Sequence, residues 1–286
     1  MKAFMRHDID NAWCPGCGNF GILNILSEVL EELDIKKQNV VFVSGIGQAA
    51  KTPHYLDVNM FNGLHGRALP VATGIKMANP ELVVVAEGGD GDMYGEGGNH
   101  FLNAARRNVN IVHIVHNNMV YGLTKGQASP TSQKEFKTGV QVEGVSNEPF
   151  NPILTALSLN ASFVARAYMK NKDHTKSILK EAFLHKGYAL VDIFQPCVVF
   201  NPVNTYEWFS QNSYILDEKE HDRTDMLSAV KKAMEIEPFA LGIFYQQTKK
   251  TFEEYLGRDK GSFAPLYTKK HDMKELKKHF DGYTIY

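Results

Sequence analysis

The chain has 286 residues, of which 43% are hydrophobic and 22% are charged, and its formal net charge is −1. This balance argues against nucleic-acid binding, which is typical of basic chains, and no run of about 18 apolar residues predicts a membrane span. The first ten residues lack the apolar core of a signal peptide, so we expect a cytoplasmic protein. Three cysteines are too few for a secreted disulfide framework and favour metal or redox chemistry.

Segments with helical and strand patterns alternate between residues 20 and 200. Residues 19–35 carry apolar side chains at helical spacing and predict an amphipathic helix. Short apolar runs predict five buried strands, at residues 39–47, 81–92, 109–118, 161–169 and 188–197. Further helices are predicted at residues 68–80, 97–108 and 174–186. Continuous apolar runs separated by helices are typical of a sheet covered on both faces, so we predict an α/β fold with a doubly wound, mostly parallel sheet.

The sequence becomes more polar in its last third. Residues 217–225 form a charged linker, and residues 249–283 are rich in lysine. We predict one α/β domain over residues 1–205 and a C-terminal extension over residues 206–286, which packs on the domain or on a partner. A solvated tail without a role is the alternative.

Three glycine-rich loops follow predicted strands, at residues 44–51, 87–100 and 116–127. In open parallel sheets, ligands bind beyond the carboxyl ends of the strands, where such loops gather. Glycine lets backbone N–H groups approach phosphate oxygens closely, and an aspartate in such a loop can hold a Mg²⁺ ion that bridges a diphosphate. The loops therefore predict a site for a diphosphate and its metal.

Cys14 and Cys17 form a CxxC pair close to the N-terminus. Such a pair could bind zinc, contribute to an iron–sulfur cluster or exchange a disulfide. Cys197 is the one further cysteine in the chain, whereas most tetrahedral sites need four ligands. The pattern alone leaves these uses open.

The order of the motifs resembles a known family. Gly89-Asp90-Gly91 followed by Asn117-Asn118 is similar to the fingerprint of enzymes that bind thiamine diphosphate (TPP). Seven segments in order resemble the β subunit of 2-oxoacid:ferredoxin oxidoreductases, at residues 13–23, 43–47, 63–80, 89–92, 97–108, 117–132 and 192–197. The resemblance implies the TPP-binding fold and a heterodimer with an α subunit. It also implies coenzyme A and ferredoxin as reaction partners and a 2-oxoacid substrate, with 2-oxoglutarate as the best match, in either direction of the reaction.

The resemblance also implies which residues bind the cofactor. The Mg²⁺ ligands would be Asp90, the Asn118 side chain and the Val120 carbonyl. Positions that contact the TPP diphosphate or line the cofactor would be Ile46, Gly47, Gln48, Ala49, His65, Gly91, Asp92, Gly122 and Leu123.

Three residues are candidates for catalysis, namely His65, Lys51 and Lys125. His65 corresponds to a position that lines the cofactor, although a helix-cap histidine is the alternative. The two lysines follow cofactor loops, where a cation could meet a carboxylate or phosphate, although solvated charges are the alternative. The glutamate that activates TPP is expected on the α subunit in this family. The chain alone is therefore expected to be catalytically incomplete.

Many members of the family hold a 4Fe–4S cluster on four cysteines. Cys14, Cys17 and Cys197 match three of these positions, and Gln48 occupies the fourth. Iron in such clusters prefers thiolate ligands, and glutamine is a poor substitute. We favour a bound 4Fe–4S cluster, with a 3Fe–4S cluster, the absence of a cluster and a zinc ion as alternatives.

Two other functions compete with this interpretation. A non-oxidative TPP-dependent decarboxylase or synthase subunit would explain the glycine loops but leave the cysteines unused. An iron–sulfur electron-transfer protein without catalysis would explain the cysteines but leave the glycine loops unused. The oxidoreductase subunit explains both sets of motifs.

Overall fold

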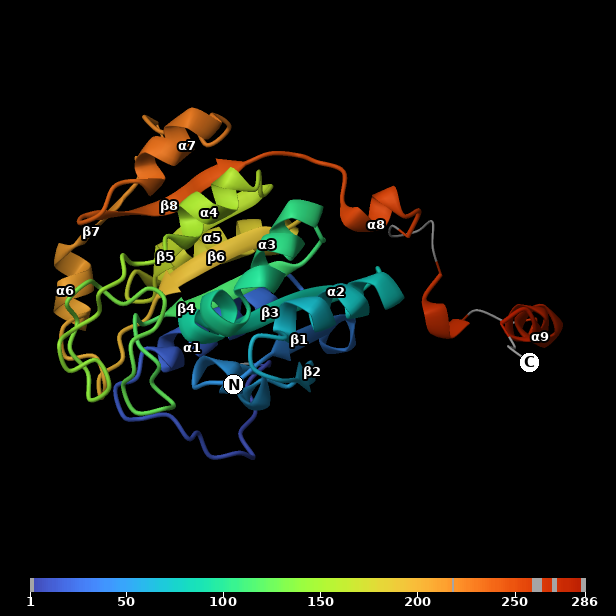
Figure 1. Ribbon diagram of the computed structural model, residues 1–286, viewed down its shortest axis with the longest axis horizontal. Helices are drawn as coiled ribbons and strands as arrows, with labels where there is room; N and C mark the ends of the chain where they lie inside the picture. Colours follow the sequence, from blue (N-terminus) through green and yellow to red (C-terminus); the bar gives the residue numbers. More distant parts are fainter. Residues whose placement is uncertain (1–2, 218, 259–263, 269–271, 284–286) are drawn as a thin grey trace.

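The computed structural model describes residues 3–217, 219–258, 264–268 and 272–283. Its described part is built on an eight-stranded sheet with the strand order β2-β1-β3-β4-β6-β5-β8-β7 (Figure 1). The strands are β1 Val40–Ser44, β2 Asn59–Asn62, β3 Val83–Gly89, β4 Val112–Asn117, β5 Phe163–Tyr168, β6 Ala189–Phe194, β7 Ser213–Ile215 and β8 Phe239–Gln246. The pairings among β1 to β6 are all parallel, whereas β8 runs antiparallel to β5.

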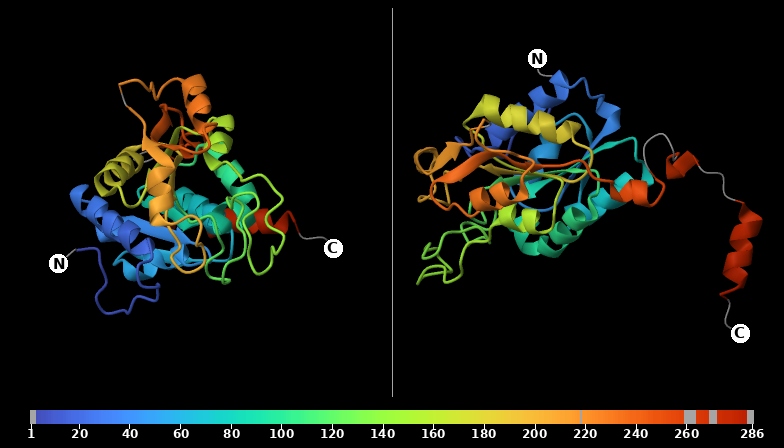
Figure 2. Two further views of the ribbon diagram at one scale, coloured as in Figure 1. Left: turned by 90° about the vertical axis from the view of Figure 1, so that its left-hand side faces the viewer. Right: turned by 90° about the horizontal axis from the view of Figure 1, so that it is seen from above.

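Helices cover both faces of the sheet (Figure 2). One face packs on α1 (Asn19–Glu32) and α5 (Lys172–Leu184), with Phe42, Val85 and Ile193 in the shared core. The other face packs on four helices, which are α2 Ala68–Ala78, α3 Gly98–Arg107, α4 Pro152–Ser158 and α7 Met226–Ala233. Because the strands are buried on both sides, they read as continuous apolar runs in the sequence.

Shorter helices complete the described chain. The α-helices are α6 Tyr206–Gln211, α8 Phe252–Tyr255 and α9 Met273–Asp281. Turns of 3₁₀-helix span Lys37–Asn39, Ala49–Tyr55 and Leu266–Thr268, and a π-helical turn spans Gly91–Glu96. None of the helices in the described ranges is both long and apolar enough to cross a membrane.

The predicted α/β fold with a doubly wound, mostly parallel sheet is confirmed, and all five predicted strands are present as β1, β3, β4, β5 and β6. Strands β2, β7 and β8 were not predicted from the sequence. Strand β8 is buried along its interior and pairs with β5, so the sheet continues past residue 205. The division into a domain and an extension stays a prediction, but residues 206–246 contribute two strands and two helices to the sheet and its cover.

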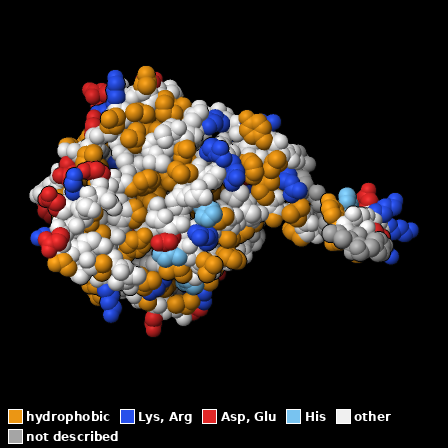
Figure 3. Space-filling model, viewed as in Figure 1, with side chains coloured by type: hydrophobic (Ala, Val, Ile, Leu, Met, Phe, Trp, Pro, Cys, Tyr) orange, Lys and Arg blue, Asp and Glu red, His pale blue; other side chains and the backbone are white. Residues whose placement is uncertain are grey.

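The last described helix, α9, stands apart from the body of the molecule (Figures 1 and 3). None of its residues is buried, and the exposed fractions of Met273 and Phe280 are 72% and 70%. Whether this part of the predicted extension packs on a partner stays a prediction.

A buried histidine in the core makes the stability of the fold depend on pH. His113 on β4 is fully buried, and its Nδ1 lies 2.6 Å from the Tyr188 hydroxyl. Burial lowers the pKa of His113 from 6.5 to about 3, because the charged ring loses its hydration. Below pH 6.5, His113 binds a proton in the unfolded chain but stays neutral in the folded chain. The free energy of unfolding therefore falls as the pH falls from 6.5 towards 3.

We predict that His113→Asn weakens this acid sensitivity. Between pH 7 and pH 5, His113 should account for about 2 kcal/mol of the loss in the free energy of unfolding. Urea denaturation at the two pH values measures this loss, and the variant should lose about 2 kcal/mol less than the wild type. His7→Asn, at an exposed position, should keep the wild-type loss, and equal losses in all three proteins would contradict the prediction.

Candidate cofactor site and cysteine cavity

The loops after β1, β3 and β4 meet at the carboxyl edge of the sheet and enclose a cavity of about 70 Å³. Every predicted cofactor and Mg²⁺ position lines this cavity, namely Ile46, Gly47, Gln48, Ala49, His65, Asp90, Gly91, Asp92, Asn118, Val120, Gly122 and Leu123. We call it the cofactor cavity. Lys51 and Lys125 do not line it, and their catalytic roles stay predictions.

Asp90 follows β3 and is almost completely buried, with 1% of its surface exposed. Its Oδ2 accepts hydrogen bonds from Ser129 Oγ at 2.5 Å and from Thr131 Oγ1 at 2.6 Å. Burial raises the pKa of the Asp90 carboxyl to about 6, although both hydroxyls oppose the shift. A carboxylate held in this way is costly to ionise without a cation beside it, so the position suits a metal ligand.

The oxygen donors predicted to accompany Asp90 lie in the loop after β4. Asn118 Oδ1 accepts from the Val120 N–H at 3.1 Å, and Asn118 Nδ2 donates to Gln195 Oε1 at 3.3 Å. These bonds orient the amide, and a single aspartate, an amide and a backbone carbonyl form a hard, oxygen-only set that fits Mg²⁺. The remaining ligands would be phosphate oxygens.

Asp92 ties three loops together. Its Oδ1 accepts from the N–H groups of Ile46 at 3.1 Å and Gly66 at 2.8 Å, and it lies 3.0 Å from His65 Nδ1. Burial raises the pKa of Asp92, and its bonds to the two backbone N–H groups oppose that shift. Because Asp92 holds the loops after β1 and β2 against the turn after β3, it shapes the wall of the cofactor cavity.

Gly66 is required at its position in this arrangement. Its φ of +69° lies in the left-handed region, and a Cβ there would lie 2.3 Å from the Glu96 carbonyl carbon. Gly74 in α2 is a contrasting glycine, because a Cβ there would meet nothing within 4 Å.

We predict opposite effects of the same substitution at these two glycines. Gly66→Ala should lower the free energy of unfolding by about 1–3 kcal/mol, through backbone strain and overlap. Gly74→Ala should raise it by about 0.5–1 kcal/mol, because alanine favours the helix. Chemical denaturation of the two variants measures both values, and a Gly66→Ala protein as stable as the wild type would contradict the assignment.

Sequence reasoning missed Ser129, Thr131 and Tyr121. The hydroxyls of the first two orient Asp90, and the Tyr121 ring packs over the turn at Gly91, with its hydroxyl donating to the Gly91 carbonyl at 3.1 Å. Ser129 and Thr131 belong to one of the segments that carry the family resemblance, but hydroxyl residues in a loop have no distinctive spacing. Their contact with Asp90 is visible only in three dimensions.

Cys14, Cys17, Cys197 and Gln48 line a second cavity of about 30 Å³, which we call the cysteine cavity. Gln195 Nε2 lies 3.6 Å from Cys17 Sγ and also donates to the Pro196 carbonyl at 2.7 Å. Burial raises the pKa of the Cys17 thiol to about 11. The structure thus brings together the three cysteines that the resemblance assigned to a cluster.

All three cysteines line the same cavity. No three His, Cys, Asp or Glu side chains of the described chain converge closely enough to hold one metal ion. In an iron–sulfur cluster each thiolate binds a different iron, so the sulfur atoms do not need to meet at one point. Three thiols on the lining of one cavity are a donor set that an iron–sulfur cluster could use.

The two cavities share a wall. Gln48, Asn118 and Gly122 line both of them. The Gly122 backbone approaches Cys197 so closely that a Cβ there would lie 3.6 Å from Cys197 Sγ. A group in one cavity would therefore be separated from a group in the other by the thickness of these residues.

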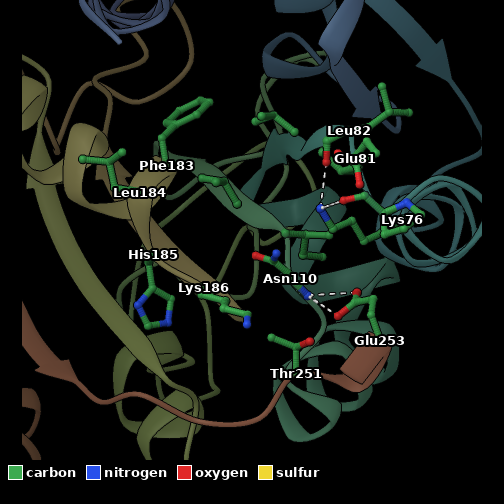
Figure 4. Close-up of a pocket in the computed structure, with 15 residues that line it drawn as sticks. Lys76, Glu81, Leu82, Asn110, Phe183, Leu184, His185, Lys186, Thr251 and Glu253 are labelled. Atoms are coloured by element: carbon green, nitrogen blue, oxygen red, sulfur yellow. Dashed lines mark hydrogen bonds between the residues drawn. The ribbon is translucent and has the colours of Figure 1, made fainter. Parts of the chain in front are cut away.

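A larger cavity of about 380 Å³ lies at the opposite, amino edge of the sheet (Figure 4). Polar groups on its wall already bind one another: Lys76 Nζ donates to the carbonyls of Pro80 and Leu82 at 2.9 and 2.7 Å, and the Asn110 N–H donates to Glu253. This cavity is also far from the strand ends where α/β sheets bind ligands. We therefore place the functional site at the carboxyl edge.

Two family models match the chain and bear on what kind of domain it forms. The family "Thiamine pyrophosphate enzyme, C-terminal TPP binding domain" matches residues 38–193. The family of the C-terminal part of the pyruvate ferredoxin oxidoreductase beta subunit matches residues 197–260. The fold and the first match thus define a TPP-binding enzyme domain, and the segment after it matches the C-terminal part of an oxidoreductase β subunit.

Similar proteins define the family more closely. The chain is 45% identical over 280 residues to a 2-oxoacid:ferredoxin oxidoreductase subunit beta of Sulfolobus sp, which covers 93% of this chain and 90% of the relative. It is 32% identical to the 2-oxoglutarate synthase subunit KorB of Archaeoglobus fulgidus, over 92% of this chain and 93% of the relative. The structure of 2-oxoglutarate:ferredoxin oxidoreductase from Magnetococcus marinus superimposes with a TM-score of 0.88 and 34% identity, over 97% of this chain and 94% of that one.

The chain belongs to the family of 2-oxoacid:ferredoxin oxidoreductase β subunits. It is therefore a subunit of an oxidoreductase, and a β subunit implies an α subunit as its partner. The resemblance stated from the motifs is confirmed.

Proposed function

We propose that the chain binds TPP through Mg²⁺ and an iron–sulfur cluster beside it, and that with an α subunit it oxidatively decarboxylates 2-oxoglutarate. The products would be an acyl-coenzyme A, CO₂ and two electrons for ferredoxin, and the reaction could also run in reverse. The observation that carries the proposal is the shared wall, because it puts a cofactor cavity and a thiol-lined cavity on two sides of Gln48, Asn118 and Gly122. The Magnetococcus marinus structure, which contains 2-oxoglutarate, coenzyme A and succinyl-CoA, supports the choice of substrate.

The described residues have distinct tasks in this proposal. Asp90, Asn118 and the Val120 carbonyl would hold Mg²⁺, and the N–H groups of the glycine turns would bind the diphosphate. Bound TPP would supply the electron sink that decarboxylation needs. His65 lines the cavity with its Nδ1 3.0 Å from Asp92 Oδ1, and its ring would exchange a proton with a bound substrate.

The size of the cofactor cavity supports a site that is completed by a partner. Small-molecule pockets usually enclose about 300–1,000 Å³, whereas this one encloses about 70 Å³. The chain therefore forms one wall of a site, and the α subunit would provide the opposite wall and the activating glutamate. Lys51 and Lys125 follow the lining residues Ala49 and Thr124 in sequence, and they would bind the anionic groups of 2-oxoglutarate or coenzyme A at that interface.

We predict that Asp90→Asn abolishes the retention of TPP. The amide keeps the size of the side chain but loses the charge that attracts Mg²⁺. Loss of an outer-shell partner lowers metal affinity by about 10–100-fold, so loss of the negative charge on a direct ligand should lower it by more than about tenfold. TPP released by acid from the purified protein measures retention. Asp173→Asn, on the exposed first turn of α5, should retain as much TPP as the wild type, and full retention in Asp90→Asn would contradict the Mg²⁺ assignment.

We also predict that activity requires both subunits and depends on the 2-oxoacid. The isolated chain should not reduce ferredoxin or methyl viologen, because its cofactor cavity is one wall of a site. With the α subunit, reduction should require coenzyme A and be faster with 2-oxoglutarate than with pyruvate, as measured by kcat/KM. Activity of the chain alone would contradict the proposed shared site, and a preference for pyruvate would contradict the proposed substrate.

A further inference from the structure

We propose that the cluster in the cysteine cavity has one exchangeable iron, at the corner that faces Gln48, so that the protein interconverts between four-iron and three-iron forms. This inference rests on the proposed function, because it assumes that the cavity holds a cluster. It adds a role for Gln48 and a dependence of the cluster on iron supply and oxidant.

The chain has no thiol for a fourth corner. Its only three cysteines all line the cysteine cavity. A cubane cluster has four irons, and each needs a ligand from outside the cluster. One iron must therefore bind a group other than a cysteine of this chain.

Gln48 is the side chain available for this iron. Among the described side chains that line the cavity, its Oε1 is the one buried nitrogen or oxygen atom without a hydrogen-bond partner. The other amides are engaged: Asn19 Oδ1 lies 2.8 Å from His116 Nδ1, and Asn118 Nδ2 and Gln195 Oε1 bind each other. A buried acceptor without a partner costs free energy, and a cation would relieve that cost.

The backbone holds Gln48 in place. Its carbonyl accepts a hydrogen bond from Trp13 Nε1 at 2.8 Å, and Trp13 is 5% exposed. The Trp13 ring makes edge contacts with Phe20 and Tyr55, with centroids 5.3 and 4.8 Å apart. Trp13 is the neighbour of Cys14, so the same packing positions the CxxC segment and Gln48 relative to each other.

An amide oxygen holds iron more weakly than a thiolate does. Iron in clusters prefers soft sulfur ligands, whereas the Gln48 amide is a neutral, hard oxygen donor. Removal of one electron from [4Fe–4S]²⁺ by a one-electron oxidant gives a 3+ core, and release of Fe²⁺ from the weakly held corner leaves [3Fe–4S]⁺. The reverse reaction takes up one electron and one Fe²⁺, so charge and iron balance in both directions.

The position of the exchangeable corner bears on electron transfer out of the cofactor cavity. Gln48 lies in the wall shared with the cofactor cavity, so this corner is on the side from which electrons would enter. Loss of this iron would change the cluster at the point closest to the site of oxidation. The electron output of the enzyme would then depend on whether the fourth iron is bound.

The test uses the αβ complex, purified without oxygen and with iron and sulfide measured per β subunit. Addition of ferricyanide should release about one iron in four and produce the EPR signal of an oxidised three-iron cluster. Dithionite with ⁵⁷Fe²⁺ should then restore the four-iron form, with the Mössbauer signal of the label at one site. Four irons that survive oxidation in the wild type would overturn the exchangeable corner and leave the proposed function intact, whereas a protein without iron or sulfide would overturn the proposed cluster itself.

Variants at Gln48 locate the corner. Gln48→Cys supplies a fourth thiolate and should retain all its iron after ferricyanide, and Gln48→Ala removes the amide and should lose the fourth iron faster than the wild type. Gln38→Cys makes the same substitution at an exposed turn and should lose iron as the wild type does. Circular dichroism and binding of the α subunit check that each variant is folded. Iron loss from Gln48→Cys equal to that of the wild type, or unchanged loss from Gln48→Ala, would overturn the role of Gln48.

Discussion

The buried carboxylate of Asp192 holds the centre of the sheet and its functional edge together. Its Oδ2 accepts from Arg166 Nε at 3.1 Å, and its Oδ1 accepts from the Tyr94 hydroxyl at 2.9 Å and from Asn117 Nδ2 at 3.2 Å. These bonds join β4, β5, β6 and the turn after β3. Burying two charges is costly, and it is tolerated here because hydrogen bonds satisfy the pair and the Arg166 guanidinium lies 5.1 Å from the Phe194 ring centroid and 5.2 Å from that of Phe239.

This network reaches the site through a short chain of hydrogen bonds. The side chain of Asn117 donates to Asp192 through its nitrogen, and its Oδ1 lies 2.9 Å from Thr131 Oγ1, which has a single hydroxyl proton to share between Asn117 and Asp90. The same Thr131 hydroxyl also contacts Asp90. The predicted metal ligand is therefore positioned by the sheet interior rather than by its own loop alone. Strand β8, which brings Phe239 and Phe244 to Arg166, is part of the same support, so the C-terminal segment contributes to the site although it does not line it.

The sequence predicted what depends on local pattern and missed what depends on tertiary contact. Strands β3 and β4 were predictable because burial on both faces gives them continuous apolar sequences. The glycines at the end of β3 and after it predicted a tight turn at Asp90. Strand β8 was missed because polar segments flank its apolar run, and β2 because all four of its residues are exposed. Ser129 and Thr131 lie 39 and 41 residues after Asp90 in the sequence, and a local sequence pattern cannot predict contacts between residues so far apart.

The wall between the cavities also separates two kinds of ligand. On the cofactor side, Asp90, Asn118 and Val120 offer oxygen, which suits Mg²⁺, and on the other side the three cysteines offer sulfur, which suits iron. Such a division would keep each metal in its own cavity, because neither ligand set favours the other ion. Gln48 is the exception, since it lines both cavities and its side-chain oxygen is buried without a hydrogen-bond partner. An amide oxygen is a weak ligand for iron, so a corner of the cluster held by Gln48 would be exchangeable.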